Sequence, residues 1–234
     1  RNVWVKIPSQ IPETVLRQQH ALVSSQSERL IQKQLSTIIS YDQLSLAVHR
    51  ALAAGARGIQ IQSLSRLDQT DEDTLQRRRI LERINNELDT ISPWIAGGTA
   101  TGQIKVNRDD ITVYMTQTNR ARLLWVFSND DHQQIVTHPV NNQTIEFNVS
   151  GVPVTYRPYH INFSGIKRLR GSREASNVVS LTKESNVSRI ILTADPLVRD
   201  FVQRKIYEHR TRTLQLTYDL LQQELVRLYP LTQI

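Results

Sequence analysis

The chain has 234 residues, of which 39% are hydrophobic and 22% are charged. This composition is that of a globular protein rather than a disordered one. The absence of Cys excludes disulfide scaffolds, thiolate metal sites and Cys nucleophiles, and no apolar run approaches the roughly 18 residues of a membrane-spanning helix. The net charge of +7 raises nucleic acid as a candidate partner.

The first 98 residues alternate between strand and helix patterns. A short apolar strand over 3–7 ends at Pro8. A helix over 42–54 has its apolar residues at helical spacing, with Ser40 as the expected N-cap and Gly55 as the C-terminal glycine. An alternating strand follows over 58–63, and Asp71 or Asp73 is expected to cap a helix over 74–91. This order predicts an α/β domain over 1–98.

The next region, 99–194, has a different period. Short β-rich runs recur about every 8–15 residues and are separated by Asn-, Asp- and Gly-containing turns, which is typical of an antiparallel sandwich or barrel. The runs lie at 104–106, 111–113, 123–127, 135–136, 145–149, 154–156, 178–181 and 190–192. We predict an all-β antiparallel sandwich.

The last region, 195–234, reads as one long amphipathic helix. Pro196 suits its first turn and Asp195 is expected to cap it. Apolar side chains recur from Val198 to Leu228, over a length of about 50 Å. Such a helix is longer than one sandwich face, so its outer half is expected to bury Leu220 and Leu221 against another subunit or other sequence. A homo-oligomer through this helix, between Val198 and Leu228, is therefore one of the two arrangements that the sequence leaves open.

Two segments resemble a known family. The run HRALAAGARGIQIQS over 49–63 resembles the last helix–strand unit of (β/α)8-barrel glycoside hydrolases, most of all the β-galactosidase type. The run LERINNEL over 81–88, followed by Ile91 and Pro93, is similar to their closing helix. A β-sandwich commonly follows such barrels. The resemblance implies the end of a (β/α)8 barrel followed by a sandwich, within a longer protein. The residues themselves do not set the compartment, and the resemblance favours an extracellular or periplasmic location.

The resemblance also bears on catalysis and on sugar binding. Glycosidases need two carboxyl groups across the scissile bond, and the family places them after the fourth and seventh strands. The strand over 3–7 would be the seventh, and it carries Lys6 but no Asp or Glu. We therefore assign no catalytic residue to this chain. Side chains at the carboxyl ends of barrel strands face the site, which gives four carbohydrate-binding candidates: Ser9, Gln62, Ser63 and Arg66. Trp4 is a fifth candidate, as a platform on which a sugar ring could stack.

Each of these candidates has a simpler interpretation. Trp4 lies in an apolar strand, where a Trp commonly packs into the core, and the other four fit ordinary loop or cap positions. A basic cluster of Lys167, Arg168, Arg170 and Arg173 is a candidate anion or nucleic-acid patch. The sequence favours a solvated basic turn at this point over a nucleic-acid surface.

No metal or cofactor is expected from the motifs. The six His residues show no metal-ligand spacing, and no glycine motif precedes a helix as a phosphate site requires. His49, on a helix, is expected to be structural. Two hypotheses remain: the C-terminal part of a glycoside-hydrolase-like protein, whose sandwich braces the barrel or binds a polysaccharide, and a non-enzymatic assembly protein that oligomerises through its C-terminal helix.

Overall fold

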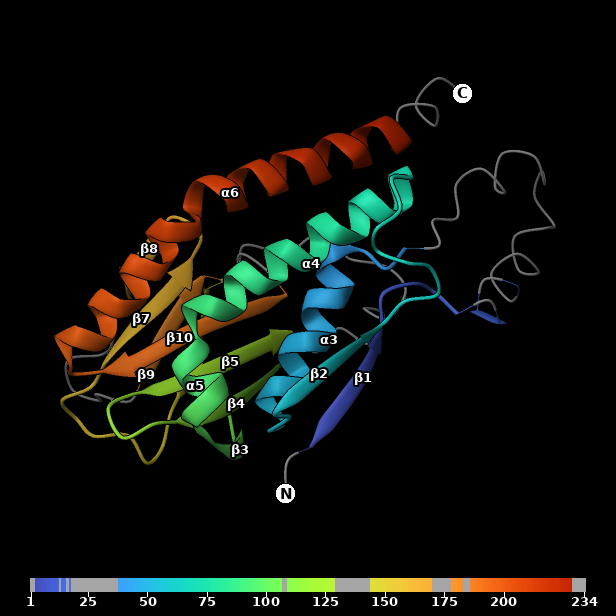
Figure 1. Ribbon diagram of the computed structural model, residues 1–234. Helices are drawn as coiled ribbons and strands as arrows, with labels where there is room; N and C mark the ends of the chain where they lie inside the picture. The colour runs from blue at the N-terminus through green and yellow to red at the C-terminus, as the bar shows by residue number, and fades with distance from the viewer. Residues whose placement is uncertain are drawn as a thin grey trace.

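The computed structural model describes residues 3–12, 14, 15, 17, 38–106, 109–128, 144–169, 178–182 and 186–228. Figure 1 shows a small parallel pair of strands, a larger antiparallel sheet and a long C-terminal helix that runs beside a second helix. Among the described helices, none is long and apolar enough to cross a membrane. The predicted run over 135–136 lies outside the described residues.

The first unit alternates strand and helix as expected. Its elements are β1 (Trp4–Pro8), α3 (Tyr41–Ala53), β2 (Gly58–Gln62), α4 (Glu72–Thr90) and the short α5 (Ser92–Gly97). Strands β1 and β2 pair in parallel, with Trp4 opposite Gly58. Local signals set the helix ends: Ser40 forms a capping box with Gln43, Asp71 accepts a hydrogen bond from the backbone of Thr74, and Gly55 takes a positive φ of 98°.

The second unit is a six-stranded antiparallel sheet with a two-stranded one packed on it. The larger sheet has the order β3-β4-β5-β10-β7-β8, and the smaller pairs β6 with β9. Two expectations were wrong: Lys167 and Arg168, predicted to lie in a basic turn, belong to edge strand β8 paired with β7, and the 154–156 run, predicted to be a strand, contains a turn before β7. The strands are β3 (Thr99–Ile104), β4 (Ile111–Gln117), β5 (Arg122–Ser128), β6 (Thr144–Asn148), β7 (Arg157–Asn162), β8 (Gly165–Arg168), β9 (Val178–Thr182) and β10 (Val187–Thr193).

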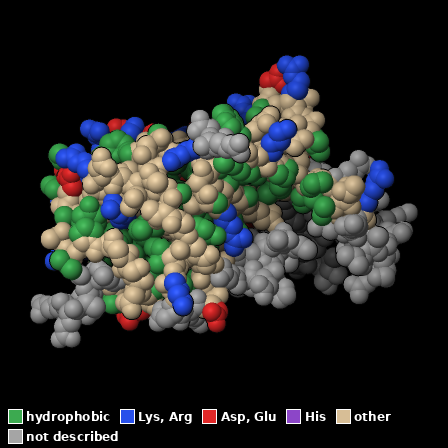
Figure 2. Space-filling model, turned by 90° about the horizontal axis from the view of Figure 1, so that it is seen from below, with side chains coloured by type: hydrophobic (Ala, Val, Ile, Leu, Met, Phe, Trp, Pro, Cys, Tyr) green, Lys and Arg blue, Asp and Glu red, His purple; other side chains and the backbone are tan. Residues whose placement is uncertain are grey.

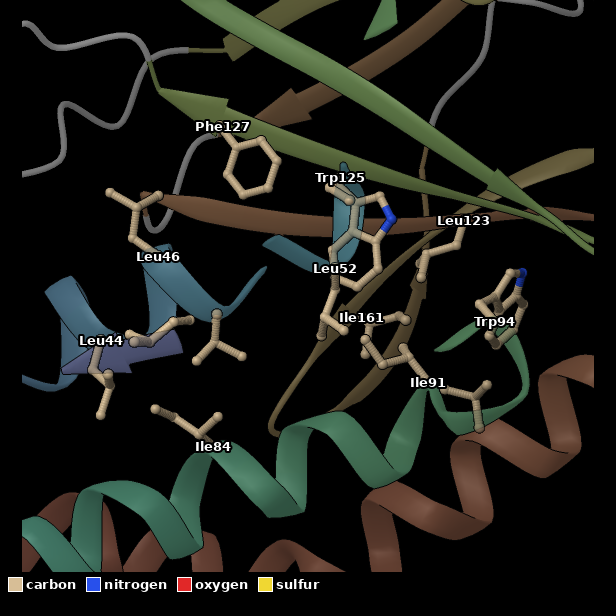
Figure 3. Close-up of a cluster of buried hydrophobic side chains, with 14 of the residues drawn as sticks. Leu44, Leu46, Leu52, Ile84, Ile91, Trp94, Leu123, Trp125, Phe127 and Ile161 are labelled. Atoms are coloured by element: carbon tan, nitrogen blue, oxygen red, sulfur yellow. The ribbon is translucent and has the colours of Figure 1, made fainter. Parts of the chain in front are cut away.

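Strand β5 separates two hydrophobic cores because its side chains alternate between the faces of the sheet. Leu124 and Val126 face β6 and β9 in one core. Leu123, Trp125 and Phe127 face the helices in the other, as Figure 3 shows. This second core is shared with β1, α3, α4 and α6. The sheet and the α/β unit are therefore packed through one continuous apolar cluster.

Helix α6 (Pro196–Leu228) lies antiparallel to α4 (Figure 1). Asp195 caps it by accepting a hydrogen bond from the backbone N–H of Leu197 at 2.9 Å, as the sequence predicted. Four ionic contacts join the two helices: Arg212 with Glu82, Arg79 with Asp219, and Lys205 and His209 with Asp89. Along these pairs the residue numbers in α6 rise while those in α4 fall, so the two helices run in opposite directions.

The outer half of α6 does not leave all its leucines unpacked. Leu216 and Leu220 are buried, and Leu220 belongs to the core that contains Ile80 and Ile84 of α4. The expectation that Leu220 lies on an interface with another chain was wrong, since α4 covers it. Leu221 is 55% exposed, so it remains accessible for contact with another chain.

Candidate functional site

A buried carboxylate lies where α3, α4 and the sheet meet. Glu87 of α4 has a side chain that is only 14% exposed, between the guanidinium groups of Arg83 and Arg189. Its Oε1 accepts a short hydrogen bond from the hydroxyl of Tyr41 on α3. The Arg83 guanidinium also stacks on the Tyr41 ring, 3.6 Å from its centroid. Residues from three separate elements thus converge on one carboxylate.

The electrostatics of this cluster keep Glu87 charged. Burial raises the pKa of the Glu87 carboxyl group, but the cation of Arg189 and the hydrogen bond from Tyr41 outweigh burial, and the pKa lies below its ordinary value. Burial and the negative charge of Glu87 raise the pKa of the Tyr41 phenol. At neutral pH the cluster therefore contains an ionised carboxylate, two guanidinium cations and a neutral phenol that donates a proton.

His49 of α3 completes the cluster. Its Nδ1 lies 2.7 Å from the backbone oxygen of Ser45, and its Nε2 lies 3.9 Å from Oε2 of Glu87. The ring packs edge-on against Trp125 of β5, with centroids 5.7 Å apart. Burial, together with the cation of Arg189, lowers the pKa of His49 to about 4. The expectation of a structural His is correct for Nδ1, but the buried Nε2 has no hydrogen-bond partner.

These groups line a cavity of about 320 Å³. Its walls come from α3, α4, α6, β7 and β10 and from the turn between β7 and β8. The volume lies at the lower end of the range of small-molecule pockets, about 300–1,000 Å³. This cavity, which is open to solvent on one side, combines a charged carboxylate with guanidinium groups and is the strongest candidate site among the described residues.

No motif in the sequence indicated this site. One pattern in the sequence could have indicated it. The apolar residues Ile80, Ile84 and Ile91 of α4 follow one another at helical spacing, and the charged residues Arg77 and Glu87 lie on the same face. A Glu at such a core-facing position requires buried partners. Arg189, 102 residues further along the chain, could not be identified as that partner from the sequence.

Of the five carbohydrate-binding candidates, Trp4 and Gln62 lie on the exposed face of the β1–β2 pair. Trp4 is 72% exposed rather than in the core, and its indole lies over Gly58, where an added Cβ would come within 2.5 Å of the ring. Ser9 is buried and donates its hydroxyl proton to the backbone oxygen of Gln62 at 3.1 Å, so it stabilises the end of the strand pair.

Ser63 and Arg66 lie in the segment after β2. The hydroxyl of Ser63 donates to the backbone oxygen of Ser65 and accepts a short hydrogen bond from Arg77, a fully buried residue of α4. Arg66 is exposed and pairs with Asp68 at 2.7 Å. Ser63 therefore has structural partners, while Arg66 remains accessible. Both lie apart from the Glu87 cavity, whose lining contains neither.

The basic cluster is only partly described. Lys167 and Arg168 are exposed on edge strand β8, where Arg168 pairs in register with Tyr159. Arg170 and Arg173 lie outside the described residues. On the face shown in Figure 2, Lys and Arg side chains are spread out rather than gathered, and hydrophobic side chains lie near its middle.

One group of side chains has the spacing of a metal site. The ligand atoms of Asp89, Glu208 and His209 lie within 4.8 Å of one another. The ammonium of Lys205 lies 3.1 Å from the Asp89 carboxylate and 3.0 Å from that of Glu208. A cation of the protein itself therefore neutralises these carboxylates, and we assign no metal there.

Comparison with known proteins gives similarity to solved structures only. No protein-family model and no curated protein matches the sequence. An Anoxybacillus α-amylase is 11% identical, with a TM-score of 0.44 over 83% of this chain and 38% of the amylase. The Thermotoga maritima α-fucosidase is 14% identical, with a TM-score of 0.45 over 68% of this chain and 35% of the fucosidase. A Geobacillus thermoleovorans α-amylase is 12% identical, with a TM-score of 0.44 over 82% and 39%.

These structures are all glycoside hydrolases, and the chain spans little more than a third of their length. With TM-scores below 0.5, the activity of this chain has to be inferred from its own residues. The finer resemblance to the end of a β-galactosidase-type barrel remains a hypothesis.

Proposed function

We propose that this chain is the C-terminal portion of a glycoside-hydrolase-like protein, in which β1, α3, β2 and α4 are the last units of a (β/α)8 barrel and the sheet braces them. The observation that supports bracing is the shared core, in which Ile7 and Leu44 of the α/β unit pack in one cluster with Leu123 and Phe127 of the sheet. Two parallel strands bury too little apolar surface to be stable alone. The sheet supplies the missing partner surface.

The other face of β1 and β2 supports the barrel part of the proposal. Val5 and Ile7 point toward the core, while Trp4, Lys6 and Gln60 are exposed on the opposite face. A barrel turns that face toward its interior. The face carries no Asp or Glu, so the proposal assigns the catalytic carboxyl groups to neither strand. Polysaccharide contact by this part of the molecule is to be sought at Trp4.

Bracing can be tested with two neighbouring leucines of β5. Leu123 and Leu124 are both fully buried but face different cores. Each change to Ala removes similar apolar volume, at a cost of about 2–5 kcal/mol. Hydrogen exchange of the full chain would then be followed in α3 and α4. We expect Leu123→Ala to accelerate exchange in both helices and Leu124→Ala to act mainly on β6 and β9.

The comparison between the two variants decides the test. If the helices keep their protection in the Leu123→Ala protein, or lose it equally in both variants, the face that packs on the helices has no particular bracing role. The matched residue type and burial of the two positions exclude a general effect of lost core volume.

A second candidate function is assembly through α6. Four exposed apolar residues, which we call the outer stripe, follow one another at spacings of four, three and four residues: Leu214, Tyr218, Leu221 and Leu225. This is the spacing of a coiled-coil seam. We propose a second copy of this chain as the partner, because a helix with the same seam matches it.

A further inference from the structure

A groove that is open to solvent lies beside the start of α6. Its volume is about 1080 Å³, close to the upper end of the range of small-molecule pockets, about 300–1,000 Å³. Residues from the end of β4, the turn between β4 and β5, α5 and the first turns of α6 line it. None of them lines the Glu87 cavity, so the groove is a separate place for a ligand.

The groove contains a positive charge that the protein does not neutralise. Arg122, at the start of β5, is partly buried, and its Nη1 donates to the backbone oxygens of Thr118 and Ala121 at 2.7 and 3.3 Å. These oxygens carry no full charge, and no carboxylate in the described part of the chain pairs with this guanidinium. A partly buried cation without a counter-charge is costly. An anion bound beside Arg122 would remove that cost.

The atom of Arg122 that can reach a ligand is Nη2. The Nε atom is fully buried and has no partner, so it is closed to a ligand. Nη2 has no hydrogen-bond partner among the described residues either, but it is not one of the buried atoms, so its protons are accessible. A guanidinium N–H forms strong, charge-assisted hydrogen bonds with a carboxylate oxygen. The groove therefore offers one strong anchor for an anion.

The other charges of the groove limit the ligand to one negative charge. Arg120 pairs with Asp195 at 2.7 Å, and Arg204 pairs with Glu208 at 3.8 Å, so both already have counter-charges. The exposed Asp200 also lines the groove and would repel a second negative charge. A phosphate monoester carries nearly two charges at neutral pH, so it fits less well than a carboxylate. A cationic ligand would face three guanidinium groups.

The turn that holds Arg122 is fixed by its own hydrogen bonds. The backbone N–H of Thr118 donates to the oxygen of Ala121 at 2.9 Å, and the hydroxyl of Thr193 donates to the backbone oxygen of Arg120, also at 2.9 Å. The second contact joins the turn to the end of β10. Because the turn is already ordered, a ligand loses little affinity to ordering the site.

Apolar side chains lie in the same groove. Leu197, in the first turn of α6, is 60% exposed, and Phe201, one turn later, is partly buried. Pro93, near the start of α5, adds a third apolar surface that is exposed. An apolar group that covers these side chains is removed from water, which favours binding. A cation beside apolar surface is the arrangement that suits an amphiphilic anion.

We propose that this groove binds an organic carboxylate with an apolar body, an aromatic or aliphatic acid. The carboxylate of the ligand accepts hydrogen bonds from Nη2 of Arg122, and its apolar body covers Leu197 and Phe201. The proposal needs neither the barrel, nor the bracing role of the sheet, nor assembly through α6. It can therefore fail or hold independently of them.

The test is titration of the full chain at pH 7 by calorimetry and by NMR, with phenylacetate and octanoate as probes. Phenylacetamide and octanamide keep the apolar body without the charge, phenethylamine and octylamine reverse the charge, and acetate keeps the charge without the body. We expect at least one of the two acids to bind and to shift the resonances of groove residues. Its affinity should exceed that of its amide, its amine and acetate by about tenfold or more.

Two variants locate the binding in the groove. Arg122→Gln should weaken it by about tenfold or more. Arg157→Gln should not, although Arg157 likewise donates to a backbone oxygen, that of Val154 at 3.2 Å. Leu197→Gln changes an exposed side chain, so it should weaken binding several-fold without lowering the melting temperature. Leu64→Gln is its control, at an exposed Leu outside the groove, and this second pair decides the test if the Arg122 variant does not fold.

Three outcomes would overturn the proposal. The first is that neither acid shifts the resonances of groove residues. The second is that an amide, an amine or acetate binds as tightly as the acid, since the ligand would then not need both the negative charge and the apolar body. The third is that each variant and its control change the affinity equally, which would place the binding elsewhere on the protein.

Discussion

The Nε2 atom of His49 lies 3.9 Å from Oε2 of Glu87, so an uncharged ring and a charged carboxylate face each other inside the protein. Burial lowers the pKa of His49 to about 4, against 6.5 for an exposed His. The ring is therefore neutral in the folded state at neutral pH. Its protonation is therefore linked to unfolding.

The sign of this linkage gives the first prediction. Between pH 6.5 and about 4 the unfolded chain binds a proton at His49 that the folded chain does not, so stability falls as the pH falls. The loss over this window is about 3 kcal/mol. The pKa of Glu87 is also lowered from its ordinary value of 4.5. The ionised carboxylate therefore contributes to the stability of the fold above pH 4.5, and this contribution is lost as the pH falls below 4.5. Urea unfolding at pH 7.5, 6 and 5 measures how the free energy of unfolding changes with pH.

The matched variant for this measurement is His49→Gln, which removes the titrating ring but keeps a polar side chain. We expect the fall in stability between pH 6.5 and 4.5 to shrink markedly in the variant. An identical slope in both proteins would show that other groups cause the pH dependence.

A second prediction concerns the charges around Glu87. Glu87→Gln leaves Arg83 and Arg189 in the core without their carboxylate, and removal of one partner from a buried ion pair costs about 3–5 kcal/mol. Adding Arg189→Met should recover part of that loss, since one of the two uncompensated cations is then gone. Urea unfolding of the single and double variants gives the coupling. Additive losses would mean that the two side chains do not interact.

Sequence patterns located most helices of this fold because the ends of a helix depend on neighbouring residues. Ser40, Gly55, Asp71 and Asp195 all act as predicted, and each contacts a backbone group within four residues or takes a special φ. Lys167 and Arg168 were predicted to lie in a turn, but their pairing with β7 makes them part of a strand. A short basic segment on a sheet edge has no periodicity of its own.

The candidate site was harder to predict from the sequence than the helices, because its residues meet only in the tertiary structure. Glu87 and Arg189 come together only after α4 packs on the sheet, and the burial of Leu220 rather than Leu221 depends on where α4 lies. Helical periodicity gave α6 an apolar side but not the identity of its partner. The helix carries two rows of apolar side chains, one covered by α4 and one exposed. Because both have helical spacing, the sequence shows them as one apolar side.

A third prediction follows from Arg77, which is 1% exposed. Its guanidinium donates to the hydroxyls of Ser65 at 2.5 Å and Thr74 at 2.8 Å, and to Ser63, so it holds the segment after β2 against α4. Arg77→Met should cost about 1.5–3 kcal/mol per strong bond lost and speed hydrogen exchange over residues 63–68. The control Arg78→Met alters an exposed neighbour on the same helix. Equal exchange in the two variants would contradict this role.

The last prediction concerns the outer stripe of α6. Leu221 and Leu225 are 55% and 68% exposed, whereas Leu216 and Leu220 hold the helix to the rest of the chain. Changing Leu221 and Leu225 to Asp should therefore leave the fold intact, as circular dichroism would show, but place two charges in the seam of a dimer. We expect light scattering to give a concentration-dependent mass for the unchanged protein and a monomer for the variant. Val154→Asp, at an equally exposed position on a turn, is the control. A monomer at every concentration before any change, or a dimer that survives both Asp residues, would rule out assembly through this stripe.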